Sequence, residues 1–176
     1  MFDPTVFDNL KVVAEGAVYD LDLQGVILIT NRCDQVDLAK LSRYFALTFR
    51  MADQGIESVH GELRLKAEIA DLASEILETQ ADETMYGCTV EVVFFTSIHH
   101  PEDDCPFIQQ NLLELWGNRP IITQKLSYFY KHSLPKRWKN TITLNFARKI
   151  GEAQADDLQV IVSLMVASID RLNEVL

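Results

Sequence analysis

Apolar residues near the start of the chain recur at the spacing of a helix. Asp3-Pro4 has the chemistry of a helix start, because a carboxylate can cap free N–H groups and proline at the first helical position loses no hydrogen bond. The apolar residues that follow at helical steps are Val6, Phe7, Leu10, Val13 and Ala14. Glycine commonly follows the last turn of a helix. We therefore predict a first helix that ends at Gly16.

The pattern then changes to alternation between apolar and polar positions. Residues 17–23 alternate, Gln24-Gly25 provides a turn, and residues 26–31 are mostly apolar, which predicts a β-hairpin. Residues 34–51 fit two interpretations. Leu38, Leu41, Phe45 and Phe49 have helical spacing, whereas Phe45, Leu47, Phe49 and Met51 alternate as in a strand. The aromatic content favours a strand for the second half of this segment.

The middle of the chain predicts a helix, a strand and a second helix. Leu63, Ala67, Ala70, Ser74 and Leu77 share one helical face, so we predict a helix over 62–79. Residues 89–98 are rich in β-branched and aromatic residues on both faces, which is typical of a central strand buried on both sides. Residues 101–106 are expected to form a loop in which Asp103 or Asp104 caps a helix over 107–116.

The last third predicts a hairpin and a long helix. Strands over 121–131 and 141–148 flank a nine-residue basic loop, and residues 153–176 carry a regular apolar stripe. Adjacent strands without a crossover helix occur twice, which favours antiparallel pairing. The predicted fold is a single α+β domain over residues 1–176, with a mostly antiparallel sheet of two hairpins plus a central strand. Helices pack on this sheet, including the long C-terminal amphipathic helix.

Composition narrows the class of protein. The chain has 176 residues, 48% of them hydrophobic, which is sufficient for one sizeable core. Three widely spaced cysteines, Cys33, Cys88 and Cys105, do not form a disulfide framework and suit a reducing compartment. No apolar run approaches the ~20 residues that cross a bilayer, and the first residues lack a secretory signal. We expect a cytoplasmic protein that does not bind membranes.

Charge is segregated along the chain. Eleven acidic residues and no Lys or Arg lie between Ala67 and Asn118, whereas eight basic residues and no Asp or Glu lie between Arg119 and Lys149. The two blocks could neutralise each other within one fold, through Glu91 or the helix over 62–79. Alternatively, the basic hairpin could face an anionic partner, or the acidic helix of one copy could meet the basic hairpin of a second, giving a homodimer.

The basic hairpin carries the candidate binding residues. Lys131, Lys136, Arg137, Trp138 and Lys139 form the anion- or partner-binding prediction. Tyr128, Phe129 and Tyr130 precede the loop, and positive charge beside aromatic rings suits both phosphates and acidic segments. If the strands pair, positive residues gather at both ends of the hairpin, with Arg148 and Lys149 near Arg119. The net charge of −10 repels a polyanion at long range, which argues against nucleic acid; an acidic protein segment is the other partner that we consider.

Evidence for catalysis is weaker. His99, His100 and Cys105 lie in the stretch richest in metal-ligand types, but adjacent histidines on an extended chain point to opposite faces. The sequence has no GxGxxG or GxxxxGK[ST] loop, so we assign no cofactor, metal ligand or catalytic residue. The leading hypothesis is a non-enzymatic cytoplasmic protein-interaction or regulatory module that forms a homodimer. The alternatives are an anion-binding module that uses the hairpin 119–149, and a small metal-dependent or cysteine enzyme centred on residues 99–105.

Overall fold

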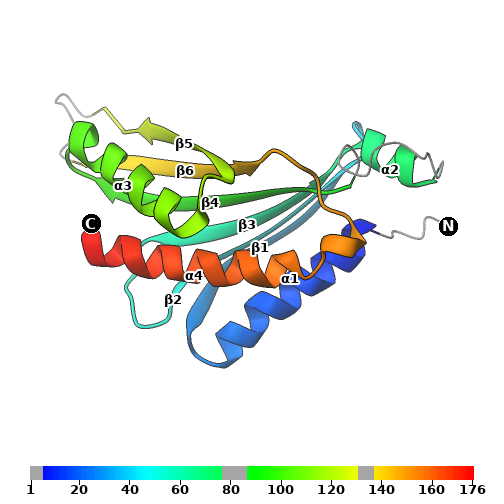
Figure 1. Cartoon of the computed structure of the whole chain (residues 1–176), viewed down its shortest axis with the longest axis horizontal. Helices are drawn as coiled ribbons and strands as arrows, with labels where there is room; N and C mark the ends of the chain where they lie inside the picture. Colours follow the sequence, from blue (N-terminus) through cyan, green and yellow to red (C-terminus); the bar gives the residue numbers. More distant parts are fainter. Residues whose placement is uncertain (1–5, 77–86, 131–136) are drawn as a thin grey trace.

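Six strands form one antiparallel sheet with helices on one of its faces. The structure, a computed structural model, describes residues 6–76, 87–130 and 137–176. The elements are α1 (Val6–Leu23), β1 (Ile27–Asp37), β2 (Ser42–Met51), β3 (His60–Ala67), α2 (Ile69–Ile76), β4 (Thr89–Ile98), α3 (Pro101–Trp116), β5 (Pro120–Ser127), β6 (Trp138–Phe146), the short 3₁₀ helix η1 (Glu152–Gln154) and α4 (Asp157–Val175). The strand order is β1-β2-β3-β4-β6-β5. The predicted α+β class with a mostly antiparallel sheet is confirmed (Figure 1).

The core lies between the sheet and the helices α1, α4 and α3. Helix α4 contacts both α1 and α3 and lies over β2 and β3 (Figure 1). Its buried residues follow the predicted stripe, namely Leu158, Val162, Met165, Ile169 and Leu172. At Gly61 of β3 the helix comes so close that a Cβ atom would lie 2.8 Å from Ile169 Cδ1. The prediction that the last helix packs on the sheet is therefore confirmed.

Residues 17–23 continue the first helix, so the predicted hairpin over residues 17–31 is wrong. Val18 and Leu21 extend the inward face already occupied by Leu10 and Ala14, and burial of this face outweighs the helical cost of Gly16, about 1 kcal/mol. Strand β1 pairs instead with β2, antiparallel from Ile27 opposite Met51. Strand β2 confirms the strand interpretation of the second half of residues 34–51.

Residues 62–67 belong to strand β3, so the predicted helix over 62–79 is wrong in its first part. The inward side chains of β3 are Leu63, Leu65 and Ala67, while Glu62, Arg64 and Lys66 point to the opposite face. This alternation was present in the sequence, but the same apolar residues also fit helical steps over a short window. A helix does follow, from Ile69 to Ile76, and residues 77–79 of the prediction lie outside the described residues.

Helix α3 begins at Pro101, earlier than predicted, so residues 101–106 are helical and not a loop. Proline suits the first helical position, and an Asp104 carboxylate oxygen accepts hydrogen bonds from the backbone N–H groups of His99 (3.1 Å) and His100 (2.8 Å). The prediction that Asp103 or Asp104 caps a helix over 107–116 is therefore wrong, because both residues lie in the first turns of α3, whose N-cap is His100.

Strand β4 is central, as predicted, and pairs with β3 on one side and β6 on the other. On its helix-facing side Val90, Val92, Phe94 and Ile98 are buried. No helix in the described ranges covers the opposite face, where Val93 is buried and the other side chains of β4 are half-buried, so the predicted burial on both sides is wrong.

The hairpin of β5 and β6 is also confirmed, and it runs from Pro120 opposite Phe146 to Ser127 opposite Lys139. Its predicted bounds are wrong, because β5 ends at Ser127 and not at residue 131, and β6 spans Trp138–Phe146 and not 141–148.

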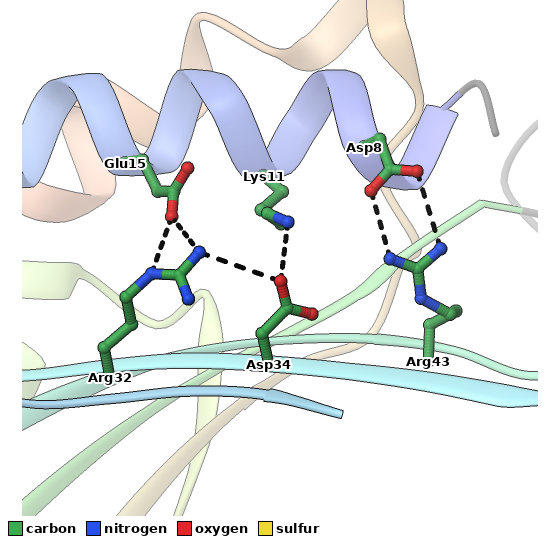
Figure 2. A network of polar contacts seen from close by, with 6 residues as sticks. All are labelled: Asp8, Lys11, Glu15, Arg32, Asp34 and Arg43. Carbon is green, nitrogen blue, oxygen red and sulfur yellow. Dashed lines mark hydrogen bonds and ion pairs between the residues drawn. The ribbon is translucent and has the colours of Figure 1, made fainter. Parts of the chain in front are cut away.

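The two edges of the sheet differ. On β1, a register shift between Ile29 and Asn31 interrupts the ladder, and Arg32 and Asp34 point toward α1 (Figure 2). The ion pairs that join α1 to the sheet are Glu15–Arg32 (2.6 Å), Lys11–Asp34 (2.6 Å) and Asp8–Arg43 (3.1 Å). Bulges and inward-pointing charges hinder pairing with another chain. Strand β5, described over its full length, carries neither a bulge nor an inward-pointing charge, and its residue Ile121 is 63% exposed.

Candidate functional site

Aromatic and basic side chains gather where β5 ends and β6 begins. We call this group the aromatic–basic surface, and its members are Tyr128, Phe129, Tyr130, Arg137, Trp138 and Lys139. Because Ser127 is paired with Lys139, the residues just beyond each strand lie side by side. Trp138 is also opposite Ile98 of β4, so this surface lies at the same end of the sheet as the connection from β4 to α3.

Ring contacts organise this surface without burying it. The rings of Tyr128 and Trp138 meet edge to face with centroids 4.8 Å apart, and Lys139 Nζ lies 5.6 Å from the centroid of Phe129. Tyr128, Phe129 and Tyr130 are 42%, 78% and 71% exposed. Aromatic faces next to a cation can accept an apolar or aromatic side chain together with an acidic one.

The structure brings together three of the five predicted binding residues, Arg137, Trp138 and Lys139. Lys131 and Lys136 lie outside the described residues. Sequence reasoning had placed Tyr128, Phe129 and Tyr130 beside the basic loop without including them among the site residues. The available signal was three successive aromatic residues directly after an alternating strand, where at least one of them must leave the buried face.

The acidic and basic blocks make only limited use of one another. A contact between Lys149 and Asp71 joins the two blocks, while Arg148 pairs with Asp157 at 2.6 Å. Arg137 lies 3.8 Å from the exposed Glu57, a geometry that contributes little to stability. Glu91, the expected cross-strand partner of the basic hairpin, pairs instead with Lys66 of β3 at 2.6 Å. The described cations of the aromatic–basic surface therefore keep most of their charge available.

The open face of the sheet is polar and largely satisfied by its own contacts. Glu62 accepts hydrogen bonds from Arg64 (2.6 Å) and from the hydroxyl of Thr48 (2.8 Å). Partial burial opposes the charge of Arg64, but its hydrogen bond to the Glu62 carboxylate and the neighbouring negative groups raise the pKa of Arg64 above the ordinary value. Burial also raises the pKa of Tyr44. This face therefore offers fewer unsatisfied groups to a ligand than the aromatic–basic surface.

Residues 99–105 lie at the end of β4 and in the first turns of α3. The Asp104 carboxylate is engaged by backbone N–H groups, and within the described ranges no three His, Cys, Asp or Glu side chains form a metal-binding group. Burial, together with the negative charges of Asp104 and Glu102, raises the pKa of the Cys105 thiol. A raised pKa keeps the thiol protonated, which is the opposite of what a cysteine nucleophile requires.

Comparison with protein-family models, curated proteins and solved structures yields no match for this chain. Of the helices that the structure describes, none combines the length and the apolar character needed to cross a bilayer.

Proposed function

We propose that this protein is a non-enzymatic interaction module that binds an acidic segment of another protein through the aromatic–basic surface. The observation that carries the proposal is the run of three exposed aromatic residues, Tyr128, Phe129 and Tyr130, beside Arg137 and Lys139. Three free cysteines are consistent with a cytoplasmic setting for this activity.

Exposure of these rings is unfavourable unless something covers them. Aromatic residues and arginine are enriched at the energetic centres of protein interfaces, because a ring buries a large area and loses few rotamers. Phe129 has no polar group to bind water, yet it is the most exposed ring of the three. An apolar or aromatic side chain of the partner would cover it, and a carboxylate would pair with Lys139 or Arg137.

An acidic protein segment fits this surface better than nucleic acid. A net charge of −10 repels a polyanion at long range, and only short Debye lengths remove that effect. Single-stranded nucleic acid also needs a continuous positive groove along its backbone. The described part of this surface offers two cations, Arg137 and Lys139, which suffice for a carboxylate but do not form a continuous positive groove.

Selection from a displayed peptide library tests the proposal. The library is selected on the wild type, and the recovered peptides are measured by fluorescence polarisation against a Phe129→Ser, Tyr130→Ser variant. A Leu23→Ser, Leu38→Ser variant is the matched control, because these leucines are 84% and 82% exposed and lie outside the surface. We expect peptides enriched in Asp, Glu and aromatic residues that lose at least about tenfold in affinity in the first variant only, as loss of an interface anchor implies.

Three results would contradict the proposal. The first is a set of recovered peptides without acidic enrichment, and the second is equal binding by both variants. The third is salt-dependent binding of an oligothymidylate that requires Phe129, together with no binding of acidic peptides. That result would replace the proposal with the nucleic-acid alternative. Light scattering of the wild type separately tests whether the partner is a second copy, as the homodimer prediction requires.

A further inference from the structure

The helix-covered side of the sheet contains a second feature that the proposed function does not use. A cavity of about 620 Å³ lies between the first turns of α4, the end of α3 and the end of the β5–β6 hairpin. Its apolar lining comes from Val90, Trp116, Phe146, Ile150, Ile161 and Leu164. Small-molecule sites are typically of about this size and are mostly apolar with a few polar groups.

The floor of the cavity belongs to the core, while its rim is charged. Val90, Trp116 and Ile150 are 2%, 5% and 4% exposed. The Trp116 indole N–H donates to the hydroxyl of Ser168 at 2.9 Å, so this polar group is already satisfied away from any ligand. The Trp116 ring also packs at a tilt on Phe146, with centroids 5.8 Å apart. The floor therefore offers an aromatic surface without an unmet hydrogen bond.

Three charged residues line the rim, and their net charge is positive. Arg148 and Asp157 pair with each other at 2.6 Å, which largely cancels their charges. Arg119 is exposed, and none of the ion pairs in the described part of the chain involves it. The rim therefore presents one uncompensated guanidinium above an apolar floor. A guanidinium matches a planar carboxylate, since two parallel N–H groups can bind its two oxygens.

We propose that this cavity binds a small organic carboxylate with an apolar body, with Arg119 as the carboxylate ligand. The apolar chain occupies the space over Trp116 and between Ile161 and Leu164, whose side chains are only half-buried. This site lies at the opposite end of the β5–β6 hairpin from the aromatic–basic surface, because Pro120 pairs with Phe146 and Ser127 with Lys139. It is therefore independent of the proposed protein partner.

Decanoate, decanol and decyltrimethylammonium are suitable probes, because they share an apolar chain and differ in the charge of the head group. Binding is measured below the micelle-forming concentrations by calorimetry and by fluorescence in a Trp138→Phe background, where Trp116 is the remaining tryptophan. We expect saturable binding of decanoate to a single site. Decanol should bind about tenfold more weakly, as loss of one charge-assisted hydrogen bond implies, and the cation should bind most weakly.

Two variants separate the head-group contact from the cavity. Arg119→Gln should abolish the preference for decanoate over decanol, whereas Lys125→Gln, a cation of the same hairpin away from the cavity, should retain it. Ala147→Leu adds volume at an exposed position that lines the cavity and should weaken both ligands. Circular dichroism establishes that each variant is folded.

The proposal is overturned if decanoate does not bind, or if it binds no better than decanol. It is also overturned if a folded Ala147→Leu variant binds as tightly as the wild type. Equal losses in Arg119→Gln and Lys125→Gln would assign the preference to general charge and remove Arg119 as the ligand. None of these results affects peptide binding at Phe129, so failure here and failure of the proposed function are distinguishable.

Discussion

Replacing Gly87 with alanine tests how β4 is joined to the segment before α4. Gly87 has φ +123°, and a Cβ atom there would lie 2.5 Å from the carbonyl oxygen of Ile150 and 3.0 Å from its carbonyl carbon. The next residue, Cys88, exchanges two backbone hydrogen bonds with Ile150, each 2.9 Å long. An added methyl group therefore strains the backbone and pushes apart the β-bridge between Cys88 and Ile150.

The expected cost follows from these two effects. A side chain at this φ costs about 1–3 kcal/mol, and each weakened backbone hydrogen bond adds about 1 kcal/mol. We expect Gly87→Ala to lower the free energy of unfolding by about 3–5 kcal/mol. In a protein of this length that loss corresponds to a fall of about 10 °C in Tm.

Gly16→Ala is the matched control, and its effect should have the opposite sign. Gly16 lies within α1, and a Cβ atom there would meet nothing within 4 Å. Alanine in place of an exposed helical glycine should raise the free energy of unfolding by about 1 kcal/mol. Urea denaturation followed by circular dichroism measures both variants. A Gly87→Ala protein as stable as the wild type, or a destabilised Gly16→Ala protein, would refute the reasoning.

Two further predictions concern charge. Asp34→Asn removes the partner of Lys11, so the free energy of unfolding should fall by about 1 kcal/mol at low salt. Urea titrations should show that this difference becomes smaller in high salt, and a loss that does not depend on salt would contradict an ionic cause. Cys105 should react with iodoacetamide more slowly than glutathione at neutral pH and faster as pH rises, because its raised pKa keeps it a thiol. Glu102→Gln should speed this reaction by lowering the pKa, and an unchanged rate would exclude that carboxylate as a cause.

Long, regular patterns predicted the structure well. The strands of the β5–β6 hairpin and α4 have patterns of eight or more residues that fit one period, while β4 is marked by its β-branched and aromatic residues, and the existence and type of these elements were predicted correctly. Residues 17–23 and 62–67 are shorter, and their apolar residues fit both periods. At both places the choice between helix and strand depends on which side chains pack against α4 or the sheet, as Gly61 packs beneath Ile169. A short stretch of sequence does not show these distant contacts.

The candidate sites divide in the same way. Arg137, Trp138 and Lys139 are neighbours in sequence, so the predicted hairpin was enough to place them on one surface. The closeness of Arg119 and Arg148 also followed from strand pairing, and both residues line the cavity. The cavity itself was not predictable, because its walls come from four elements brought together by helix packing. Likewise, the choice of Lys66 as the partner of Glu91 depends on β3 lying beside β4.

The unequal edges of the sheet limit how copies of this protein can join strand to strand. Pairing of β5 with β5 of a second copy would build one continuous sheet around a two-fold axis. That sheet would then end in two β1 strands, each with a bulge and with Arg32 and Asp34 engaged by α1. Growth by this route therefore stops at a closed pair, and an open fibre would first require α1 to detach from β1.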